Sequence, residues 1–380
     1  MSISRRKFAQ LLGAGAAAVA RPALSLAKEA AATAATPGQR SSVVRLSSNE
    51  NPYGPSPRAF GAMSDAFGRA NRYPDDEAKV LVESLAKLNG VEPGEILLGD
   101  GSGEILKLAA DLFPGPLTNT TKSPGGTLVA ADPTFEAILY HAKMKGAEVV
   151  KVPLTSSYAH DLPKMLSAAR KGLVYICNPN NPTASITPAK EVRDFIAHAP
   201  NDTMILVDEA YHHYADSPDY ESMIPLVKDH PNLIVARTFS KIYGMAGLRC
   251  GYCVAQSYTV ERLRERQSWD SVNLMALVAA GASLEDSDQV TKGRALNAEA
   301  RAFTIAELAK MGYETIPSQA NFIMIDLKRP VVPIIQSLKS RKVQVGRLFH
   351  AMPNHLRLTI GKKAEMEAFL AAFRAVVAPA

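Results

Sequence analysis

The chain has 380 residues, of which 47% are apolar and 21% are charged, and it contains three cysteines. This composition excludes a mostly disordered chain, a collagen-like chain and a disulfide scaffold, and the length suits two domains or one large α/β unit with an appendage. The formal net charge is +6, but four positive charges lie in the first 27 residues, which contain no acid, so the rest carries +2. A body so close to neutral argues against nucleic-acid binding as the main function.

Residues 1–27 are typical of an export signal. Arg5 and Arg6 stand in the order Ser-Arg-Arg-x-Phe, which resembles the twin-arginine signal, and an apolar run follows at 11–20. The small residues that end at Ala27 suit a cleavage site, although an ordinary basic helix is the alternative. The apolar run is too short for a stable membrane span. We therefore expect the twin-arginine machinery to carry the folded chain to the periplasm. If the signal is not used, we expect the protein to stay in the cytoplasm.

The body of the chain begins with alternating apolar and amphipathic segments. Short apolar runs that predict buried strands occur at 127–131, 148–152, 173–177, 204–207, 233–236 and 251–255. Helical spacing of apolar residues appears between such runs, as at Ile105, Leu108, Ala109 and Leu112. Strands that alternate with helices predict βαβ units and a mostly parallel sheet flanked by helices, which is an α/β fold.

After about residue 270 the pattern changes to that of a smaller α+β domain. Helices are predicted at 287–311, 334–340 and 364–377, and strands at 321–327 and 356–360. We therefore divide the body into an N-terminal segment (43–75), a large domain (76–270) and a small C-terminal domain (271–380). Residues 28–42, rich in alanine and threonine, are expected to form a linker.

Polar residues follow several predicted strands, and in open α/β sheets ligands bind beyond the carboxyl ends of the strands. Residues 99–104 read Gly-Asp-Gly-Ser-Gly-Glu and lead into a predicted helix, whose N–H groups and dipole can bind a phosphate. Residues 178–183 read Asn-Pro-Asn-Asn-Pro-Thr, a rigid turn that can hold an amide donor at the sheet edge. Each of these turns also occurs in proteins without a ligand there.

Two further strand ends carry ionisable groups. Asp208 follows the run 204–207 directly, and a buried acid there is either a helix N-cap or the partner of a cation. Tyr211 comes one turn later and can point the same way. Lys241 stands among serine, threonine, glycine and apolar residues, where desolvation or a nearby cation would lower its pKa and make the amine a usable nucleophile.

The cysteines indicate a structural role. Cys250 and Cys253 form a CxxC sequence in a predicted strand, where their odd separation places the two side chains on opposite faces. Cys177 ends another predicted buried strand. We therefore expect neither a redox pair nor a metal site.

In this order and at these separations, the motifs resemble the class I/II aminotransferases, which are pyridoxal-phosphate enzymes of fold type I, and in particular the histidinol-phosphate aminotransferases. The resemblance runs from about Val43 to the C-terminus. It is carried by the blocks 49–54 (Asn-Glu-Asn-Pro-Tyr-Gly), 71–74 (Asn-Arg-Tyr-Pro), 178–183, 208–211, 237–252 and 356–361 (Leu-Arg-Leu-Thr-Ile-Gly). It implies the fold-type I architecture, a large domain with a mostly parallel sheet plus a smaller α+β domain.

The resemblance assigns the cofactor, pyridoxal 5'-phosphate, to particular residues. Lys241 would hold it as an imine and carry protons, and Asp208 would keep the ring nitrogen protonated so that the ring acts as an electron sink. Asn181 and Tyr211 would hydrogen-bond the ring's phenolic oxygen, and Phe135 would stack on the ring. The remaining cofactor-binding residues implied for the phosphate are Ser102, Gly103, Glu104, Thr238, Ser240, Arg249 and, from the neighbouring subunit of a homodimer with shared active sites, Tyr73.

The resemblance also implies residues that bind the substrate. Arg357 would form a bidentate pair with the α-carboxylate, and Arg347 would lie near the distal end of the substrate. Since Arg357 stands between two leucines in a predicted strand, its side chain should point to the face opposite them. Asn49 and Tyr53 belong to the same site in the family pattern. One departure from the family is Ala184, which stands where the motif usually has glycine, and alanine is strained there if the position needs a positive φ.

The main hypothesis is transfer of an amino group between an L-amino acid, or a histidinol-phosphate-like amine, and a 2-oxo acid. A lyase, a cyclase or an oxygen-dependent oxidase of an amino acid could use the same lysine, aspartate and arginine. An exported binding protein without turnover is an alternative of a different class. Because histidine biosynthesis is cytoplasmic, export would argue against that pathway, and the sequence leaves the amino donor, the acceptor and the pathway open.

Overall fold

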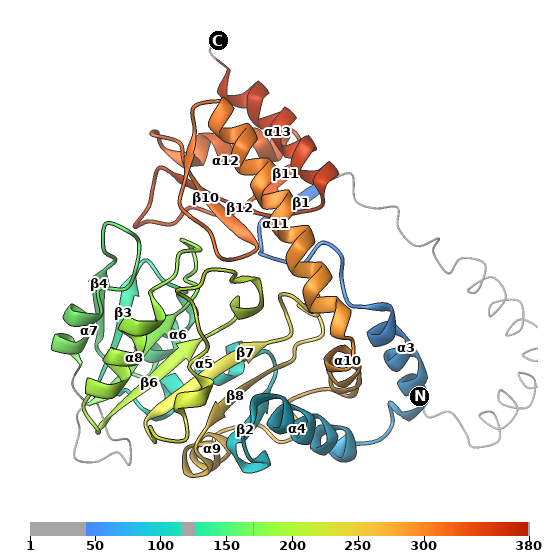
Figure 1. The fold of residues 1–380 in the computed structure, drawn as a ribbon, viewed down its shortest axis with the longest axis vertical. Coiled ribbons are helices and arrows are strands. Elements are labelled where there is room, and N and C mark those ends of the chain that lie inside the picture. The colour runs from blue at the N-terminus through green and yellow to red at the C-terminus, as the bar shows by residue number, and fades with distance from the viewer. Residues whose placement is uncertain (1–42, 116–125, 170, 379–380) are drawn as a thin grey trace, which may run out of the picture. The chain divides into compact units, whose positions relative to one another are not determined.

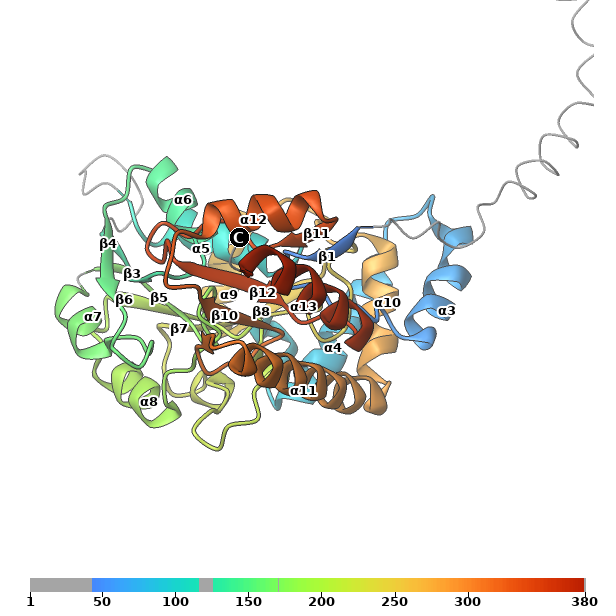
Figure 2. The same cartoon turned by 90° about the horizontal axis from the view of Figure 1, so that it is seen from above.

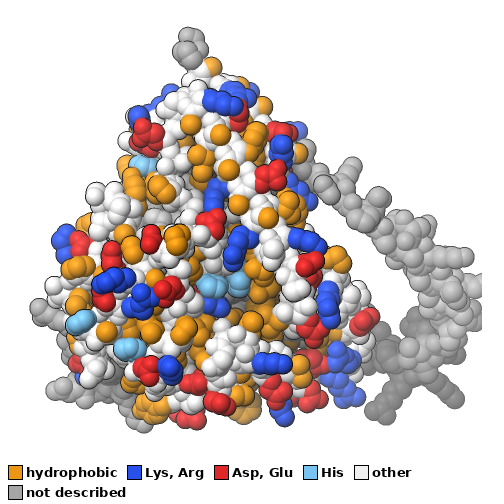
Figure 3. All heavy atoms as spheres, viewed as in Figure 1, with side chains coloured by type: hydrophobic (Ala, Val, Ile, Leu, Met, Phe, Trp, Pro, Cys, Tyr) orange, Lys and Arg blue, Asp and Glu red, His pale blue; other side chains and the backbone are white. Residues whose placement is uncertain are grey.

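The computed structural model describes residues 43–115, 126–169 and 171–378. The expected export signal and linker, residues 1–42, lie outside the described residues. Within the described part of the chain, no helix is both long and apolar enough to cross a membrane. On the face drawn in Figure 3, basic and acidic side chains are interspersed rather than gathered into one basic patch.

A seven-stranded sheet forms the centre of the larger part of the molecule (Figure 1). Its order is β2-β8-β7-β6-β5-β3-β4, and only β8 runs antiparallel to its neighbours. The strands are β2 (Ile96–Gly99), β3 (Thr127–Asp132), β4 (Val149–Pro153), β5 (Gly172–Cys177), β6 (Thr203–Asp208), β7 (Leu233–Thr238) and β8 (Gly251–Ala255). This confirms the prediction of a mostly parallel sheet in an α/β fold.

Helices cover both faces of this sheet, so the strands are apolar on both sides. In β5, Leu173 and Tyr175 pack into one core, whereas Val174 and Ile176 pack into the core on the opposite face. The helices of the first face are α5 (Ser102–Leu112), α6 (Ala137–Met144) and α9 (Ser257–Arg264). Those of the second are α3 (Pro57–Ala66), α4 (Asp75–Asn89), α7 (Leu162–Ala168), α8 (Ala189–His198) and α10 (Leu274–Leu284).

The C-terminal part has its own small sheet and core. Its antiparallel strands run in the order β12-β10-β9, with bounds β9 (Glu314–Thr315), β10 (Phe322–Asp326) and β12 (His355–Thr359). The helices around it are α11 (Ser287–Lys310), α12 (Val331–Ser340) and α13 (Lys363–Val377). The N-terminal strand β1 (Val44–Leu46) pairs in parallel with β11 (Val343–Val345), so the start of the described chain joins this part (Figure 2).

The structure places α10 differently from the sequence-based division at residue 270. Val272, Ala276 and Leu277 pack into the core of the large sheet, and the C-terminal core includes helix α11 only from Ala300 onward. A helix whose residues are mostly apolar all round gives no sequence signal for the core that it joins. Short 3₁₀ helices lie between the other elements, at Phe67–Arg69, Pro93–Glu95, His212–Tyr214 and Ile224–Leu226.

A buried ion pair anchors the segment that follows β6. Arg237 Nη2 and Glu209 Oε2 lie 2.8 Å apart, with side chains only 8% and 1% exposed. The Glu209 carboxylate also accepts hydrogen bonds from the Ser222 hydroxyl and the Met223 N–H, at 2.9 and 2.7 Å. These contacts fix the backbone next to Asp208 at the carboxyl end of the sheet.

Replacing Glu209 with glutamine is expected to lower the free energy of unfolding by about 3 kcal/mol, because it leaves the buried Arg237 charge uncompensated. Urea denaturation at pH 7 measures the change. The matched control is Glu285→Gln, which removes a surface pair with Arg58 whose side chains are 67% and 55% exposed, and should cost under about 0.5 kcal/mol. Equal effects of the two substitutions would contradict the structural role given to Glu209.

Candidate active site

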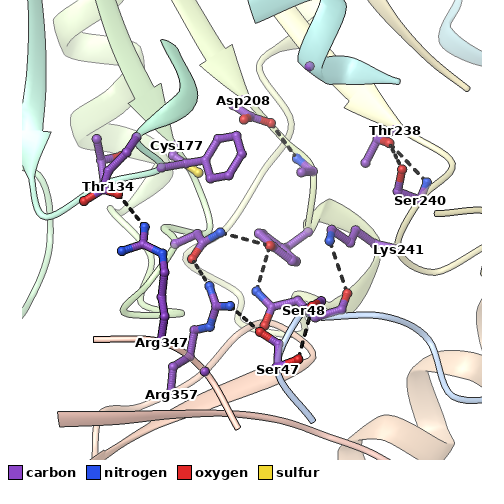
Figure 4. A pocket seen from close by; sticks show the side chains of 18 of the residues that line it. Ser47, Ser48, Thr134, Cys177, Asp208, Thr238, Ser240, Lys241, Arg347 and Arg357 are labelled. Carbon is purple, nitrogen blue, oxygen red and sulfur yellow. Dashed lines mark hydrogen bonds and ion pairs between the residues drawn. The ribbon is translucent and has the colours of Figure 1, made fainter. Parts of the chain in front are cut away.

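A cavity of about 710 Å³ lies where the carboxyl ends of the large sheet meet the C-terminal part of the chain. Figure 4 shows Asp208, Lys241 and Arg357 converging on it from different elements. Thirteen of the residues predicted for the site line this cavity: Asn49, Ser102, Gly103, Phe135, Asn181, Asp208, Tyr211, Thr238, Ser240, Lys241, Arg249, Arg347 and Arg357. The fold therefore brings together side chains that are up to 308 positions apart in sequence.

Three predicted residues do not line this cavity. The Glu104 carboxylate accepts hydrogen bonds from the Asp100 N–H and the Gln267 amide, at 2.7 and 2.9 Å, so it closes the loop instead of facing a ligand. Tyr53 is 44% exposed and lies under the Lys362 ammonium, 5.2 Å from the ring centroid. Tyr73 is 79% exposed, and its expected contact with a neighbouring subunit remains a prediction.

The start of α5 forms one wall of the cavity and provides a cradle for an anion. Gly101, with φ +70°, leads into the helix at Ser102, and a Cβ at this glycine would collide with the Arg249 guanidinium. A Cβ at Gly251 would likewise collide with the Ser102 N–H. Both glycines therefore let the arginine and the helix N-terminus approach each other, which concentrates hydrogen-bond donors and positive charge.

Two hydroxyl groups at the end of β7 face the same cradle. The Thr238 hydroxyl donates to Ser240 Oγ at 2.9 Å and accepts from the Ser240 N–H at 3.1 Å. Arg249 Nη1 donates to Ser240 Oγ at 3.4 Å. Hydroxyl donors, a guanidinium and helix N–H groups are the donor set that binds a phosphate. The Arg249 guanidinium also has an acid beside it, since its Nε lies 3.8 Å from Asp100 Oδ1 in a solvent-exposed ion pair.

Lys241 places its amine in the middle of the cavity. Lys241 Nζ donates to the Asn49 carbonyl at 3.2 Å and lies 5.6 Å from the centroid of the Tyr211 ring. Burial, with the Arg357 charge acting in the same direction, lowers the pKa of this amine from 10.5 to about 8. A substantial fraction of the amine is therefore neutral and nucleophilic near physiological pH.

In the cofactor-free enzyme, acetylation of Lys241 by acetic anhydride is expected to rise with pH around a midpoint near 8, because only the neutral amine reacts. Mass spectrometry of the Lys241 peptide measures the rate from pH 6 to pH 11. Arg357→Gln should move this midpoint upward, because the neighbouring positive charge is removed. A wild-type midpoint near that of a free lysine side chain, about 10.4, would contradict the assignment.

Asp208 lies opposite the lysine at the end of β6. Its Oδ1 accepts a hydrogen bond from the Ala210 N–H at 3.1 Å, and its Oδ2 accepts one from the Tyr175 hydroxyl at 2.8 Å. Burial raises the pKa of this carboxyl to about 6, while the two hydrogen bonds and Lys241 act in the opposite direction. A buried carboxylate at this position can balance a positive charge on a ligand in the cavity.

The Tyr211 hydroxyl is held between two amide groups. It accepts hydrogen bonds from the Asn49 and Asn181 side-chain amides, at 3.0 and 3.3 Å. Since both contacts use its oxygen as acceptor, its single proton remains available to donate to a ligand. Burial raises the pKa of Tyr211, so the phenol keeps that proton at neutral pH.

Arg357 is a half-buried cation that faces the cavity. The neighbours Leu356 and Leu358 pack into the C-terminal core, which confirms the predicted opposite orientation of Arg357 in β12. Its Nη1 donates to Asn181 Oδ1 at 2.8 Å and its Nη2 donates to the Ser47 carbonyl at 2.7 Å. Its Nε is buried without a hydrogen-bond partner, and no acid of the described residues forms an ion pair with it. These properties are typical of a receptor for a substrate anion.

Comparison with known proteins identifies the family. The model for "Aminotransferase class I and II" matches residues 41–373. The chain belongs to this family. It is 37% identical to a histidinol-phosphate aminotransferase of Symbiobacterium thermophilum (88% of this chain, 91% of the relative) and 38% identical to one of Moorella thermoacetica (88% and 86%). A solved histidinol-phosphate aminotransferase of Sinorhizobium meliloti, in complex with pyridoxal 5'-phosphate, is 29% identical with a TM-score of 0.79 (88% and 90%).

The departure of this aminotransferase from the family motif is visible in the backbone. Ala184 has φ +60° and is fully buried. The sequence-based concern that this position needs a positive φ is therefore confirmed. The left-handed conformation costs a non-glycine residue roughly 1–2 kcal/mol. Hydrogen bonds hold it in place, from its N–H to the Asn180 carbonyl and from the Gln319 N–H to its own carbonyl, both at 2.8 Å.

Several functional contacts of the aminotransferase were not predicted from sequence. Arg347 forms an ion pair with Glu136 across the cavity and stacks on Phe349, 4.4 Å from the ring centroid. Arg357 lies over the same ring at 5.1 Å, so Phe349 separates and orients the two arginines. The position of Phe349, two residues after Arg347, is a sequence signal that could have predicted the stacking. The hydrogen bond from Arg357 to the Ser47 carbonyl has no sequence signal, because every residue has a backbone carbonyl.

The cysteines of the aminotransferase lie as predicted. Cys250 packs into the core on one face of the large sheet and Cys253 into the core on the other, so the opposite-face prediction is confirmed. Burial raises the pKa of both thiols to about 12. Among the described residues, no group of three or more histidine, cysteine, aspartate or glutamate side chains is placed to hold a metal ion.

Proposed function

We propose that this chain is a pyridoxal-5'-phosphate-dependent aminotransferase that moves an amino group between an anionic primary amine and a 2-oxo acid. The amine is an L-amino acid or a compound like histidinol phosphate, the substrate named for the curated relatives. The observation that carries the proposal is the convergence of Lys241, Asp208 and the unpaired Arg357 on one cavity beside an anion cradle.

The residues of the cavity suit this cofactor. When bound, pyridoxal phosphate supplies an aromatic ring that takes up negative charge from the substrate carbon. The phosphate of the cofactor would be held by the N-terminus of α5, the Thr238 and Ser240 hydroxyls and Arg249. The Tyr211 hydroxyl would donate to the phenolic oxygen of the cofactor. The hydroxyl, guanidinium and helix N–H donors of the cradle, with glycines at the points of close approach, support this assignment.

Three ionisable side chains of the cavity would each have a separate role in the reaction. The Lys241 amine would attach the cofactor at rest and, once released, take a proton from the substrate α-carbon at Nζ and deliver it to the C4′ carbon of the cofactor. The Asp208 carboxylate would balance the positive charge of the ring nitrogen. Arg357 would hold the substrate anion and thereby orient the carbon–hydrogen bond toward the lysine.

Arg357→Gln is expected to raise KM for an anionic amine roughly 10- to 100-fold, the effect of losing a hydrogen-bonded charge pair. The kcat value should change much less, because the Lys241 amine and Asp208 are untouched. Steady-state kinetics with the donor identified below gives both values. Arg193→Gln, at a surface ion pair with Glu221, is the control. An unchanged KM would mean that Arg357 does not bind the substrate anion.

We also propose a homodimer in which each subunit completes the other's site. Large apolar side chains are exposed on the N-terminal segment, namely Phe60 (53%), Phe67 (67%) and Tyr73 (79%). Trp269 (94%), which lines a surface pocket together with Pro74 and Asp75, adds a fourth. Exposed aromatic residues of this kind favour burial against a partner. Sedimentation velocity should give twice the chain mass. Tyr73→Phe should weaken the binding of pyridoxal phosphate. A monomer with full activity would overturn the proposal.

Export by the twin-arginine route to the periplasm is a further part of the proposal, supported by the Ser-Arg-Arg-x-Phe sequence at residues 4–8. Cell fractionation should find the shortened chain in the periplasm. Replacing both Arg5 and Arg6 with lysine should leave the full-length chain in the cytoplasm. A wild-type chain that stays uncleaved in the cytoplasm would overturn export while leaving the enzymatic proposal intact.

A further inference from the structure

The Tyr175 hydroxyl is the one side-chain donor that the structure gives to the Asp208 carboxylate. The distance from the hydroxyl to Asp208 Oδ2 is 2.8 Å, and the tyrosine is fully buried. The backbone N–H of Ala210 occupies the other oxygen, Oδ1. Both carboxylate oxygens are therefore anchored from within the protein, and their remaining lone pairs are left for a ligand.

The pairing of β5 with β6 explains how Tyr175 reaches this position. In the parallel register Tyr175 stands opposite Leu206, and Cys177 stands opposite Asp208. Residues two apart share a face of the sheet, so these four side chains lie on the same face. Two residues along a strand span about 6–7 Å, which a phenol ring can bridge, so the tyrosine hydroxyl ends beside the carboxylate.

A purely structural explanation accounts poorly for this tyrosine. The remainder of β5 is Gly-Leu-Val before it and Ile-Cys after it, and phenylalanine would fill the same space without burying a hydroxyl. Burying a hydroxyl is unfavourable unless it is hydrogen-bonded, and the bond that satisfies this one is directed at the Asp208 carboxylate. The position of the hydroxyl therefore matters for the carboxylate.

We propose that Tyr175 is a positioning residue: its hydroxyl fixes the Asp208 carboxylate in the orientation and the charged state in which it pairs with the ring nitrogen of the cofactor. This inference rests on the proposed function. A charged acceptor binds a hydroxyl donor more strongly than a neutral one does, so the contact favours the ionised carboxylate. Without the hydroxyl, the carboxylate would be free to rotate about its side-chain bonds and would lose one of its two fixed partners.

The surroundings of Asp208 define what the removal of this hydroxyl should do. The titratable groups that interact with the carboxyl are Tyr175, Lys241, Glu209, Tyr211 and Tyr220, with the Cys177 thiol beside Tyr175. Burial raises the pKa of Asp208, and the tyrosine hydrogen bond lowers it. Tyr175→Phe should therefore move that pKa upward and leave less of the carboxylate ionised near neutral pH.

The test compares two ligands on cofactor-free enzyme: pyridoxal phosphate and its analogue with carbon in place of the ring nitrogen. Only the first can pair its ring with Asp208, so the ratio of the two dissociation constants reports this contact alone. Absorbance titration at pH 7 and pH 9 gives both constants for the wild type, Tyr175→Phe and Tyr252→Phe. Tyr252 is a matched control because it is a buried tyrosine of the same sheet that packs into the core on the other face.

Tyr175→Phe should lower the preference for the natural cofactor at least ~10-fold, more at pH 7 than at pH 9, with analogue binding changed less than about twofold. Tyr252→Phe should keep the wild-type preference. An unchanged preference in Tyr175→Phe, or equal weakening of both ligands, would overturn the positioning role and leave the proposed function standing. If wild-type enzyme binds neither ligand, the proposed function fails and this inference fails with it. Urea denaturation checks that both variants are folded.

Discussion

Replacing Lys241 with alanine is expected to lower kcat/KM by at least ~10³-fold, or about 4 kcal/mol of activation free energy. The reason is that one amine serves both as the group that attaches the cofactor and as the proton carrier, and proton carriage alone typically contributes ~10²- to 10⁴-fold. The cavity places that amine within 3.2 Å of the Asn49 carbonyl and near the ring of Tyr211, and no second lysine lines the cavity. The side chain therefore has no substitute in the described structure.

Steady-state kinetics and borohydride reduction measure the Lys241 prediction together. Reduction of the loaded wild type should fix the cofactor to the peptide that contains Lys241, and the alanine variant should show no such attachment. Lys190→Ala is a control, because the side chain of Lys190 is 79% exposed in a surface pair with Asp194. Activity of Lys241→Ala within ~10-fold of the wild type, about 1.4 kcal/mol of activation free energy, would show that another group performs the chemistry.

Asp208→Asn should have the second large effect, a fall in kcat of ~10³-fold. Asparagine has nearly the same shape and still offers an oxygen to one of the donors, Tyr175 or Ala210, but it is neutral and cannot balance a positive ring nitrogen. Activity should fall without a matching loss of structure. Single-turnover measurements with the loaded enzyme separate this effect on chemistry from an effect on cofactor binding.

The same substitution should raise the free energy of unfolding near neutral pH, although it lowers activity. The pKa of Asp208 is raised on folding, from 3.8 to about 6, so the ionised carboxylate costs stability above pH 6 and this cost disappears below pH 3.8. Asp208→Asn should therefore stabilise the cofactor-free protein at pH 8 and change it little at pH 3.5. Asp194→Asn, a surface change, is the control for urea denaturation. Destabilisation at pH 8 with retained activity would contradict the role given to Asp208.

Local sequence patterns predicted the parts of the site that depend on one element at a time. The alternation of Leu356, Arg357 and Leu358 placed the arginine away from the core, and the structure confirms it. The apolar runs gave most strands of the large sheet to within one or two residues at their ends. Period-two burial and strand ends are local properties, which is why they could be inferred without the fold.

The parts that could not be predicted depend on the pairing of distant segments. Tyr175 meets Asp208 only because β5 and β6 pair in a particular register, which no local pattern specifies. The resemblance placed Glu104 at the helix N-terminus beneath the phosphate, which stays a prediction; that its carboxylate accepts the Asp100 N–H and the Gln267 amide could not be inferred from sequence. The start of a helix is predictable from sequence, but the direction of each side chain in its first turn is set by neighbours from elsewhere in the chain.

The most direct test of the central claim is a spectral titration of the loaded enzyme with each L-amino acid and with histidinol phosphate, in the absence of any acceptor. The proposed aminotransferase should convert its bound cofactor from the pyridoxal form to the pyridoxamine form with one of these amines, which identifies the donor, and a 2-oxo acid should reverse the change. A cofactor that keeps its pyridoxal spectrum with every amine, or that recovers it while ammonia is released or oxygen is consumed, would contradict amino transfer and indicate a lyase or an oxidase instead.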